Sequence, residues 1–224
     1  MKTGKLFVVA TPIGNLEDIT LRALRILKEV DLIACEDTRR TGILLKHYNI
    51  EKPLVSYHQH SKLQKVEYLS DQLKSGQNIA LVTDAGTPGI SDPGGVLIEK
   101  AVKNKIEVEP IPGPSSFAAI LSVAGFYLDK FLYLGFLPKK KGKQTLLKKI
   151  AVSDVPIVIC ESPHRIMATL KSIQEIAGDK YVVVGRELTK KFAEIYRGKI
   201  SEILPKIRPQ GEFVIIINSK KEII

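Results

Sequence analysis

Short runs of strand-forming residues alternate with amphipathic segments through the first half of this sequence. The strand-like runs are residues 6–10, 31–35, 53–57, 79–83 and 106–111. Between them, apolar residues recur at helical spacing, as at Leu21, Leu24 and Leu27 and again at Leu63, Val66, Leu69 and Leu73. Strands separated by helices are typical of βαβ units. The pattern therefore predicts an α/β fold whose N-terminal sheet is mainly parallel.

The second half of the sequence has strand-like runs with fewer helices between them, which predicts a mixed sheet. These runs are residues 131–135, 156–160, 181–184, 193–196 and 213–217. One helix is well marked: we expect Ser162 to cap it, Pro163 to be its first residue and Gly178 to end it.

A Gly- and Pro-rich segment at residues 111–116 separates the two halves. We therefore predict two lobes, an N-terminal α/β lobe of residues 1–113 and a C-terminal α/β lobe of residues 114–224 with the mixed sheet. The hydrophobic content of 44% is enough to give both lobes a core.

The sequence predicts a cytoplasmic protein. Its apolar runs are far shorter than the roughly 20 residues of a membrane-spanning helix, and the N-terminus has no pattern of a secretion signal. Cys35 and Cys160 each lie in an apolar run, so buried thiols are expected. The net charge of +10 favours a polyanionic partner such as nucleic acid, although basic proteins also gain solubility from such charge.

Three Gly- and Pro-rich turns each follow a predicted strand, at residues 11–15, 84–94 and 112–116. In open α/β sheets, ligands bind beyond the carboxyl ends of the strands. We expect Asp92 to cap a helix that begins at Pro93, and Ser115 or Ser116 to cap the next one, so that free N–H groups favour an anionic group. Neither a Walker A motif nor a G-x-G-x-x-G motif occurs. The alternative is that these turns are ordinary loops.

Seven ordered segments together resemble one family of enzymes. They are residues 9–16 (VATPIGNL), 35–39 (CEDTR), 56–60 (SYHQH), 84–94 (DAGTPGISDPG), 112–116 (PGPSS), 161–165 (ESPHR) and 186–190 (RELTK). Across nearly the whole chain this resembles the tetrapyrrole-methylase-like family of S-adenosylmethionine-dependent methyltransferases, and within it the branch that methylates small-subunit ribosomal RNA. Ser61 and residues 192–194 depart from the usual pattern of that branch.

The resemblance implies two lobes that hold S-adenosylmethionine in the cleft between them, in a homodimer. It implies 2′-O-methylation of a cytidine ribose, with small-subunit ribosomal RNA or the assembled small ribosomal subunit as partner. The cofactor-binding residues that it implies are Pro12, Asp84, Gly86, Ile90, Ser115 and Ser116.

Methyl transfer to a ribose hydroxyl needs alignment of the reactants and benefits from a general base. The candidate catalytic residues are Asp37, His58, Glu161 and Glu187. Each has a structural alternative: Asp37 can cap a helix, His58 can be a loop residue, and Glu161 and Glu187 can pair with neighbouring arginines.

Five basic residues are candidates for substrate binding, namely Arg39, Arg165, Arg186, Lys139 and Lys140. Arginine suits phosphates and carboxylates, and the two lysines belong to an acid-free basic segment between Asp129 and Asp154. Surface ion pairs and a solvated loop are the structural alternatives. No metal site is expected, because the cysteines lie far apart in sequence and no metal-binding spacing occurs.

Two other functions remain open at this point. A small-molecule methylase acting on a tetrapyrrole would share the fold and the cofactor. A ribosome-assembly protein without turnover would keep the fold but would not bind S-adenosylmethionine.

Overall fold

A computed structural model of the chain describes residues 3–57, 63–90, 92 and 94–219. The chain forms two compact units, Met1–Ser115 and Ser116–Ile224. The sequence placed the division two residues earlier, after residue 113. Each unit is described by itself below.

The N-terminal unit is built on a five-stranded sheet in the order β3-β2-β4-β1-β5. Every pair of neighbouring strands is parallel, which confirms the predicted parallel sheet. Its elements are β1 (Lys5–Val9), η1 (Leu16–Asp18), α1 (Leu21–Glu29), β2 (Leu32–Cys35), α2 (Thr38–His47), β3 (Leu54–Ser56), α3 (Leu63–Lys74), β4 (Ile79–Val82), α4 (Gly95–Lys103) and β5 (Glu107–Ile111).

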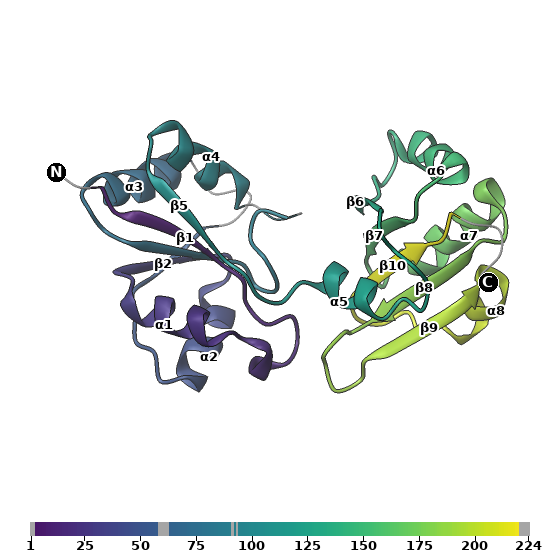
Figure 1. Ribbon diagram of the computed structural model, residues 1–224, viewed down its shortest axis with the longest axis horizontal. Coiled ribbons are helices and arrows are strands. Elements are labelled where there is room, and N and C mark those ends of the chain that lie inside the picture. The colour runs from purple at the N-terminus through teal and green to yellow at the C-terminus, as the bar shows by residue number, and fades with distance from the viewer. Residues whose placement is uncertain (1–2, 58–62, 91, 93, 220–224) are drawn as a thin grey trace. The chain divides into compact units, whose positions relative to one another are not determined.

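Helices cover both faces of this sheet. Helices α1 and α2 pack on one face, where Leu27 and Leu44 join a core cluster with Ile33. Helices α3 and α4 pack on the other face, where Leu69 and Leu97 join a second cluster. Figure 1 shows the two helix layers on either side of β1, β2 and β5. Burial on both faces explains why the inner strands β2 and β4 are continuous apolar runs.

Helix α1 buries Leu27 and packs Leu24 against the core, as the apolar pattern predicted, but it leaves Leu21 outside. The Thr20 hydroxyl accepts the N–H of Ala23, as expected of an N-cap. Leu21, however, is 86% exposed, and the buried residues of the helix are Ala23, Ile26 and Leu27. The predicted face was wrong at Leu21 because this residue opens the helix, one turn before the part that packs on the sheet.

The C-terminal unit contains a second five-stranded sheet, in the order β6-β7-β10-β8-β9. Strands β6 and β7 are parallel and the other neighbours are antiparallel, which confirms the predicted mixed sheet. Its elements are α5 (Ser116–Ser122), β6 (Leu132–Phe136), α6 (Lys143–Val152), β7 (Ile157–Glu161), α7 (Ile166–Ala177), β8 (Tyr181–Arg186), β9 (Glu194–Lys199), α8 (Ile200–Ile203), η2 (Leu204–Lys206) and β10 (Phe213–Ile217).

The two faces of the second sheet are covered unequally. Helices α6, α7 and α8 contribute Leu147, Leu170 and Ile203 to a large core cluster on one face. The short helix α5 packs on the other face, where Ile120 joins a smaller cluster with Val158. In the described part of the chain, every helix is too short or too polar to cross a membrane.

Two helices begin later than the sequence predicted. Helix α7 begins at Ile166, not at Pro163, because the Ser162 carbonyl accepts the N–H groups of Arg165 and Ile166 and forms a turn first. Its end at Gly178, with φ of 84°, is as predicted. Helix α4 begins at Gly95 with Gly94 as its N-cap. Asp92 is not the cap, since its Oδ1 accepts the N–H groups of Gly89 and Gly94 and closes a turn.

Candidate functional site at the carboxyl edge of the N-terminal sheet

The three Gly- and Pro-rich turns meet at the carboxyl edge of the N-terminal sheet. Thr11 and Gly86 form a two-way bridge, in which each N–H donates to the other carbonyl at 2.9 and 3.0 Å. The Thr87 hydroxyl donates to the carbonyl of Pro114 at 3.2 Å. Because β1 lies between β4 and β5, the turns that follow these strands are brought side by side. The predicted convergence of the turns is therefore present.

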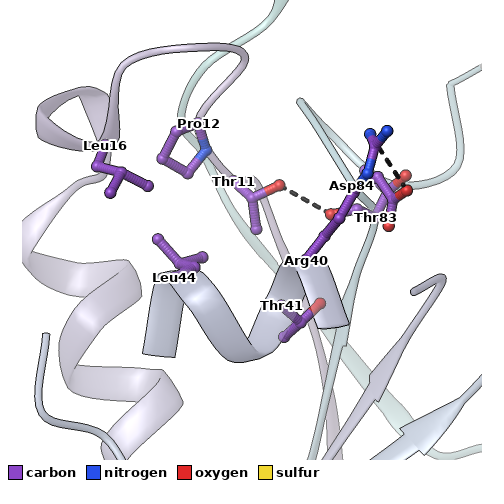
Figure 2. Close-up of a pocket in the computed structure, with 8 residues that line it drawn as sticks. All are labelled: Thr11, Pro12, Leu16, Arg40, Thr41, Leu44, Thr83 and Asp84. Carbon is purple, nitrogen blue, oxygen red and sulfur yellow. Dashed lines mark hydrogen bonds and ion pairs between the residues drawn. The ribbon is translucent and has the colours of Figure 1, made fainter. Parts of the chain in front are cut away.

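A pocket of about 70 Å³ opens at this edge (Figure 2). One wall is apolar and the other is polar, with a carboxylate and a guanidinium. Its lining residues are Thr11, Pro12, Leu16, Arg40, Thr41, Leu44, Thr83 and Asp84. Pro12 and Asp84 were predicted from the sequence as cofactor-binding residues.

Hydrogen bonds join the ends of β1, β2 and β4 behind the pocket. The Thr11 hydroxyl donates to the carbonyl of Thr83 at 3.0 Å, as Figure 2 shows. The Thr83 hydroxyl in turn donates to Glu36 Oε2 at 2.9 Å. Thr11 and Thr83 are both buried. This arrangement fixes three strand ends relative to one another.

Asp84 is the carboxylate that faces the pocket. Its Oδ1 accepts the N–H of Asp37 at 3.0 Å, and Arg40 Nη1 lies 3.5 Å from its Oδ2. Burial raises the pKa of Asp84, and the nearby Glu36 carboxylate raises it further, while the Asp37 N–H and Arg40 act in the opposite direction. Asp84 can therefore accept hydrogen bonds from a ligand, and its protonation state depends on Glu36, Asp37 and Arg40.

Asp37 has a clear structural function. Its side chain caps α2 by accepting the N–H of Arg39. The Arg39 guanidinium donates to both carboxylate oxygens, at 3.0 and 2.7 Å, and lowers the pKa of Asp37 to about 2. The sequence left open whether Asp37 is catalytic or a cap, and its contacts are those of a cap.

Glu161 is buried in the C-terminal unit and fully engaged. Its Oε1 accepts the N–H of Ser162 at 2.8 Å, and its Oε2 accepts the hydroxyl of Thr169 at 2.7 Å. Arg165 Nη2 lies 3.3 Å from Oε2 and also donates to the carbonyl of Leu137 at 2.6 Å. These contacts tie the start of α7 to the end of β7.

Glu187 and Arg186 support the loop that follows β8. Arg186, whose side chain is 8% exposed, donates to the carbonyl of Gln210 at 2.7 Å and to Glu194 at 2.9 Å. Glu187 Oε1 accepts from Lys190 Nζ at 2.8 Å and from the N–H of Glu212 at 2.9 Å. Burial alone would raise the pKa of Glu187, but these two hydrogen bonds together with the positive charges of Lys190 and Arg186 hold the pKa below its ordinary value.

Several predicted site residues lie outside the pocket. Gly86 borders it through the bridge to Thr11 and has φ of 85°, a backbone conformation that favours glycine. Ile90 is 41% exposed. Ser115 is the last residue of the N-terminal unit, and Ser116 is the first residue of α5. His58 lies outside the residues that the structure describes.

Lys139 and Lys140 lie on the surface in the turn between β6 and α6. Within the part of the chain that the structure describes, neither lysine makes an ion pair. Their charge is therefore available to a polyanion. Over the same described ranges, no group of His, Cys, Asp and Glu side chains is arranged to hold a metal ion.

The sequence analysis missed most of the polar wall of the pocket. Thr83 directly follows β4 and Thr11 lies two residues after the end of β1, positions that mark them as site residues in an α/β sheet. On α2 the sequence indicated Arg39 as a binding residue, whereas the next residue, Arg40, lines the pocket. Residues one apart on a helix point about 100° away from each other.

Comparisons with known proteins agree on the fold and on one group of relatives. Residues 5–204 match the model of the family described as Tetrapyrrole (Corrin/Porphyrin) Methylases. A relative from Thermotoga maritima, named ribosomal RNA small subunit methyltransferase I, is 46% identical over 97% of this chain and 100% of its own length. A protein of the same name from Escherichia coli O157:H7 is 46% identical over 97% of this chain and 79% of its own length.

Solved structures with this fold are more distant in sequence. The methyltransferase CobJ has a TM-score of 0.73 and 17% identity, over 99% of this chain and 97% of that one. Uroporphyrin-III C-methyl transferase from Thermus thermophilus, solved with S-adenyl homocysteine, has a TM-score of 0.68 and 16% identity, over 96% of this chain and 98% of that one. At this identity the likeness establishes the fold.

Proposed function

Because this chain belongs to the tetrapyrrole (corrin/porphyrin) methylase family, we propose that it is an S-adenosylmethionine-dependent methyltransferase that acts on small-subunit ribosomal RNA. The observation that supports the substrate is the 46% identity, over 97% of the chain, to relatives named for this activity. The structural neighbours named for a precorrin or for uroporphyrin III are only 16–18% identical.

The carboxyl edge of the N-terminal sheet supports the proposed cofactor site. Its three turns converge there, and the pocket between Pro12 and Asp84 offers both apolar surface and hydrogen-bond acceptors. Such a mixture suits a ligand with a nucleoside and an amino-acid part. The proposed cofactor residues are those that the sequence predicted, Pro12, Asp84, Gly86, Ile90, Ser115 and Ser116, with Arg40 added from the pocket. Thr11 and Thr83 are not included, because their hydroxyls already donate within the chain.

The proposed reaction is methylation of the 2′-hydroxyl of a cytidine. S-adenosylmethionine supplies an electrophilic methyl group on a sulfonium. The contribution of this chain is alignment, because a hydroxyl held in line for attack gains much of its acceleration from position. The general base stays a prediction among Asp37, His58, Glu161 and Glu187. The three described carboxylates already accept hydrogen bonds within the chain, which favours a positioning function for them.

The proposed RNA contact lies on the basic surface before α6. Lys139 and Lys140 are exposed and lack ion pairs in the described part of the chain, and the net charge of +10 adds long-range attraction. Arg39 is also available, since its side chain is 88% exposed even while it pairs with Asp37. Arg165 and Arg186 are held by internal contacts. A homodimer and a cytoplasmic location complete the proposal.

Methyl transfer from labelled S-adenosylmethionine tests the proposal. The acceptors are small ribosomal subunits that lack the modification, naked small-subunit RNA, and uroporphyrinogen III as a tetrapyrrole. We expect label in the RNA of the subunit or of the naked transcript and none in the tetrapyrrole. Label in the tetrapyrrole alone would support the small-molecule methylase instead. If the protein does not bind S-adenosylmethionine in calorimetry, the result would support a ribosome-assembly protein without turnover. Light scattering checks the dimer.

A further inference from the structure

We infer that Glu36 is a positioning residue of the cofactor site, which holds the carboxylate of Asp84 at the pocket through Thr83 and through the turn that it shares with Asp37. Glu36 does not line the pocket itself. The inference rests on the proposed function, because it assigns a task to Asp84 in binding S-adenosylmethionine.

Glu36 links three neighbouring strand ends. It directly follows β2, and its Oε2 accepts the hydroxyl of Thr83, which follows β4. Its carbonyl accepts the hydroxyl of Ser56, the last residue of β3, at 3.4 Å. Thr83 is 7% exposed, so its hydroxyl depends on Glu36 for a partner. Loss of this acceptor would free the residue that immediately precedes Asp84.

Asp84 is held from the same turn on its other side. The N–H of Asp37, the residue after Glu36, donates to Asp84 Oδ1 at 3.0 Å. Among the residues that the structure describes, the other oxygen, Oδ2, has only the longer contact of 3.5 Å to Arg40, whose side chain is 64% exposed. One oxygen of Asp84 is thus fixed by the protein, and the other is oriented for a ligand that donates hydrogen bonds.

Glu36 also acts on Asp84 through its charge. The described charged or titratable groups that act on Asp84 are Glu36, Asp37, Arg39, Arg40 and the Cys35 thiol. Among the acids, Glu36 has the larger effect in raising the pKa of Asp84. If cofactor binding requires ionised Asp84, affinity falls as the pH drops through this pKa. Removal of the Glu36 charge should therefore move that loss to lower pH.

The experiment measures the dissociation constant of S-adenosylhomocysteine by calorimetry as a function of pH. The variant Glu36→Gln keeps an oxygen that can accept from Thr83 but removes the charge. We expect the acidic loss of affinity to move to lower pH, because the Glu36 carboxylate is one of the causes that raise the pKa of Asp84. Glu29→Gln is the matched control, since Glu29 pairs with Arg25 on the exposed surface of α1. It should leave the profile unchanged.

A second pair of variants tests the hydrogen bond. Thr83→Val removes the donor to Glu36 and should weaken binding at neutral pH by about tenfold or more, as expected for one hydrogen bond to a charged group. Thr83→Ser keeps the hydroxyl and should bind like the wild type. Thermal unfolding of each variant confirms that it is folded.

The outcomes separate this inference from the proposed function. Wild-type protein that binds S-adenosylhomocysteine, with an unshifted profile for Glu36→Gln and unchanged affinity for Thr83→Val, would overturn the positioning task of Glu36 and leave the methyltransferase proposal intact. Wild-type protein that fails to bind would overturn both. A shifted profile together with rescue by Thr83→Ser would support the inference.

Discussion

The buried carboxylate of Glu161 gives the sharpest test of how the C-terminal unit is held together. Thr169 is fully buried on α7, and its hydroxyl donates to Glu161 Oε2 at 2.7 Å. Thr169→Val keeps the size of the side chain and removes only this donor. Because valine leaves no large cavity, the cost is mainly the lost hydrogen bond to a charged acceptor, about 1.5–3 kcal/mol.

Part of that cost is offset by a remaining partner. Arg165 Nη2 lies 3.3 Å from the same oxygen, and the N–H of Ser162 still donates to Oε1. We therefore expect Thr169→Val to lower the free energy of unfolding by about 2 kcal/mol. Urea unfolding followed by far-UV circular dichroism measures it, since the chain has no tryptophan.

A matched control is available on the neighbouring helix. Thr145 on α6 is exposed, and Thr145→Val should change stability by less than about 0.5 kcal/mol, as surface substitutions usually do. If Thr169→Val is no more destabilising than Thr145→Val, Glu161 is not held by this hydrogen bond, and a catalytic task for it would regain support.

Three further predictions follow from the site and the surface. Asp37→Asn keeps a residue that can cap α2 but removes its charge. The wild type should therefore be more stable than the variant above about pH 4, and this difference should vanish as the pH falls through the pKa of Asp37, about 2. Urea unfolding at several pH values measures the difference. Gly86→Ala should cost about 1–2 kcal/mol in the same assay, because φ is 85° although a Cβ would lie 3.5 Å from Ile13 Cγ2 and so has room. Reversal of both charges in Lys139→Glu/Lys140→Glu should weaken RNA binding more than tenfold and lower its salt dependence by about two counterions, as filter binding at several salt concentrations would reveal.

Each of these predictions has its own check. For Asp37, a stability difference that is as large at pH 2 as at neutral pH would mean that the charge is not its source. For Gly86, an unchanged stability would mean that the positive φ is not required. For the lysines, the control is Lys171→Glu/Lys206→Glu, which makes the same change of net charge at other exposed positions of the C-terminal unit. Equal weakening by both double variants would refute a local RNA contact.

The sequence predicted the strands well for a physical reason. The inner strands β2 and β4 are covered by helices on both faces, so their residues form uninterrupted apolar runs that stand out from their surroundings. Helix starts were harder to predict. Asp92 and Ser162 belong to residue types that cap helices, but each forms a turn that precedes the helix. The same hydrogen-bonding groups serve both purposes, and only the surrounding structure decides between them.

The candidate site could be predicted only in part, because it depends on strand order. Strand β4 lies between β2 and β1 in the sheet, although in the sequence it follows both of them and β3. The contacts of Glu36 with Thr83 and of Asp37 with Asp84 both span 47 residues. The family resemblance indicated Asp84 and Pro12, and local patterns marked only the turns that contain them. They could not show that Glu36 reaches Thr83, or that Asp37 is already occupied by Arg39.

The most direct test of the central claim is the identity of the methylated nucleoside. Small ribosomal subunits without the modification are incubated with the protein and labelled S-adenosylmethionine, and their RNA is digested to nucleosides for mass analysis. We expect labelled 2′-O-methylcytidine. Label on a base, or no label in RNA while the cofactor still binds, would contradict the proposed function.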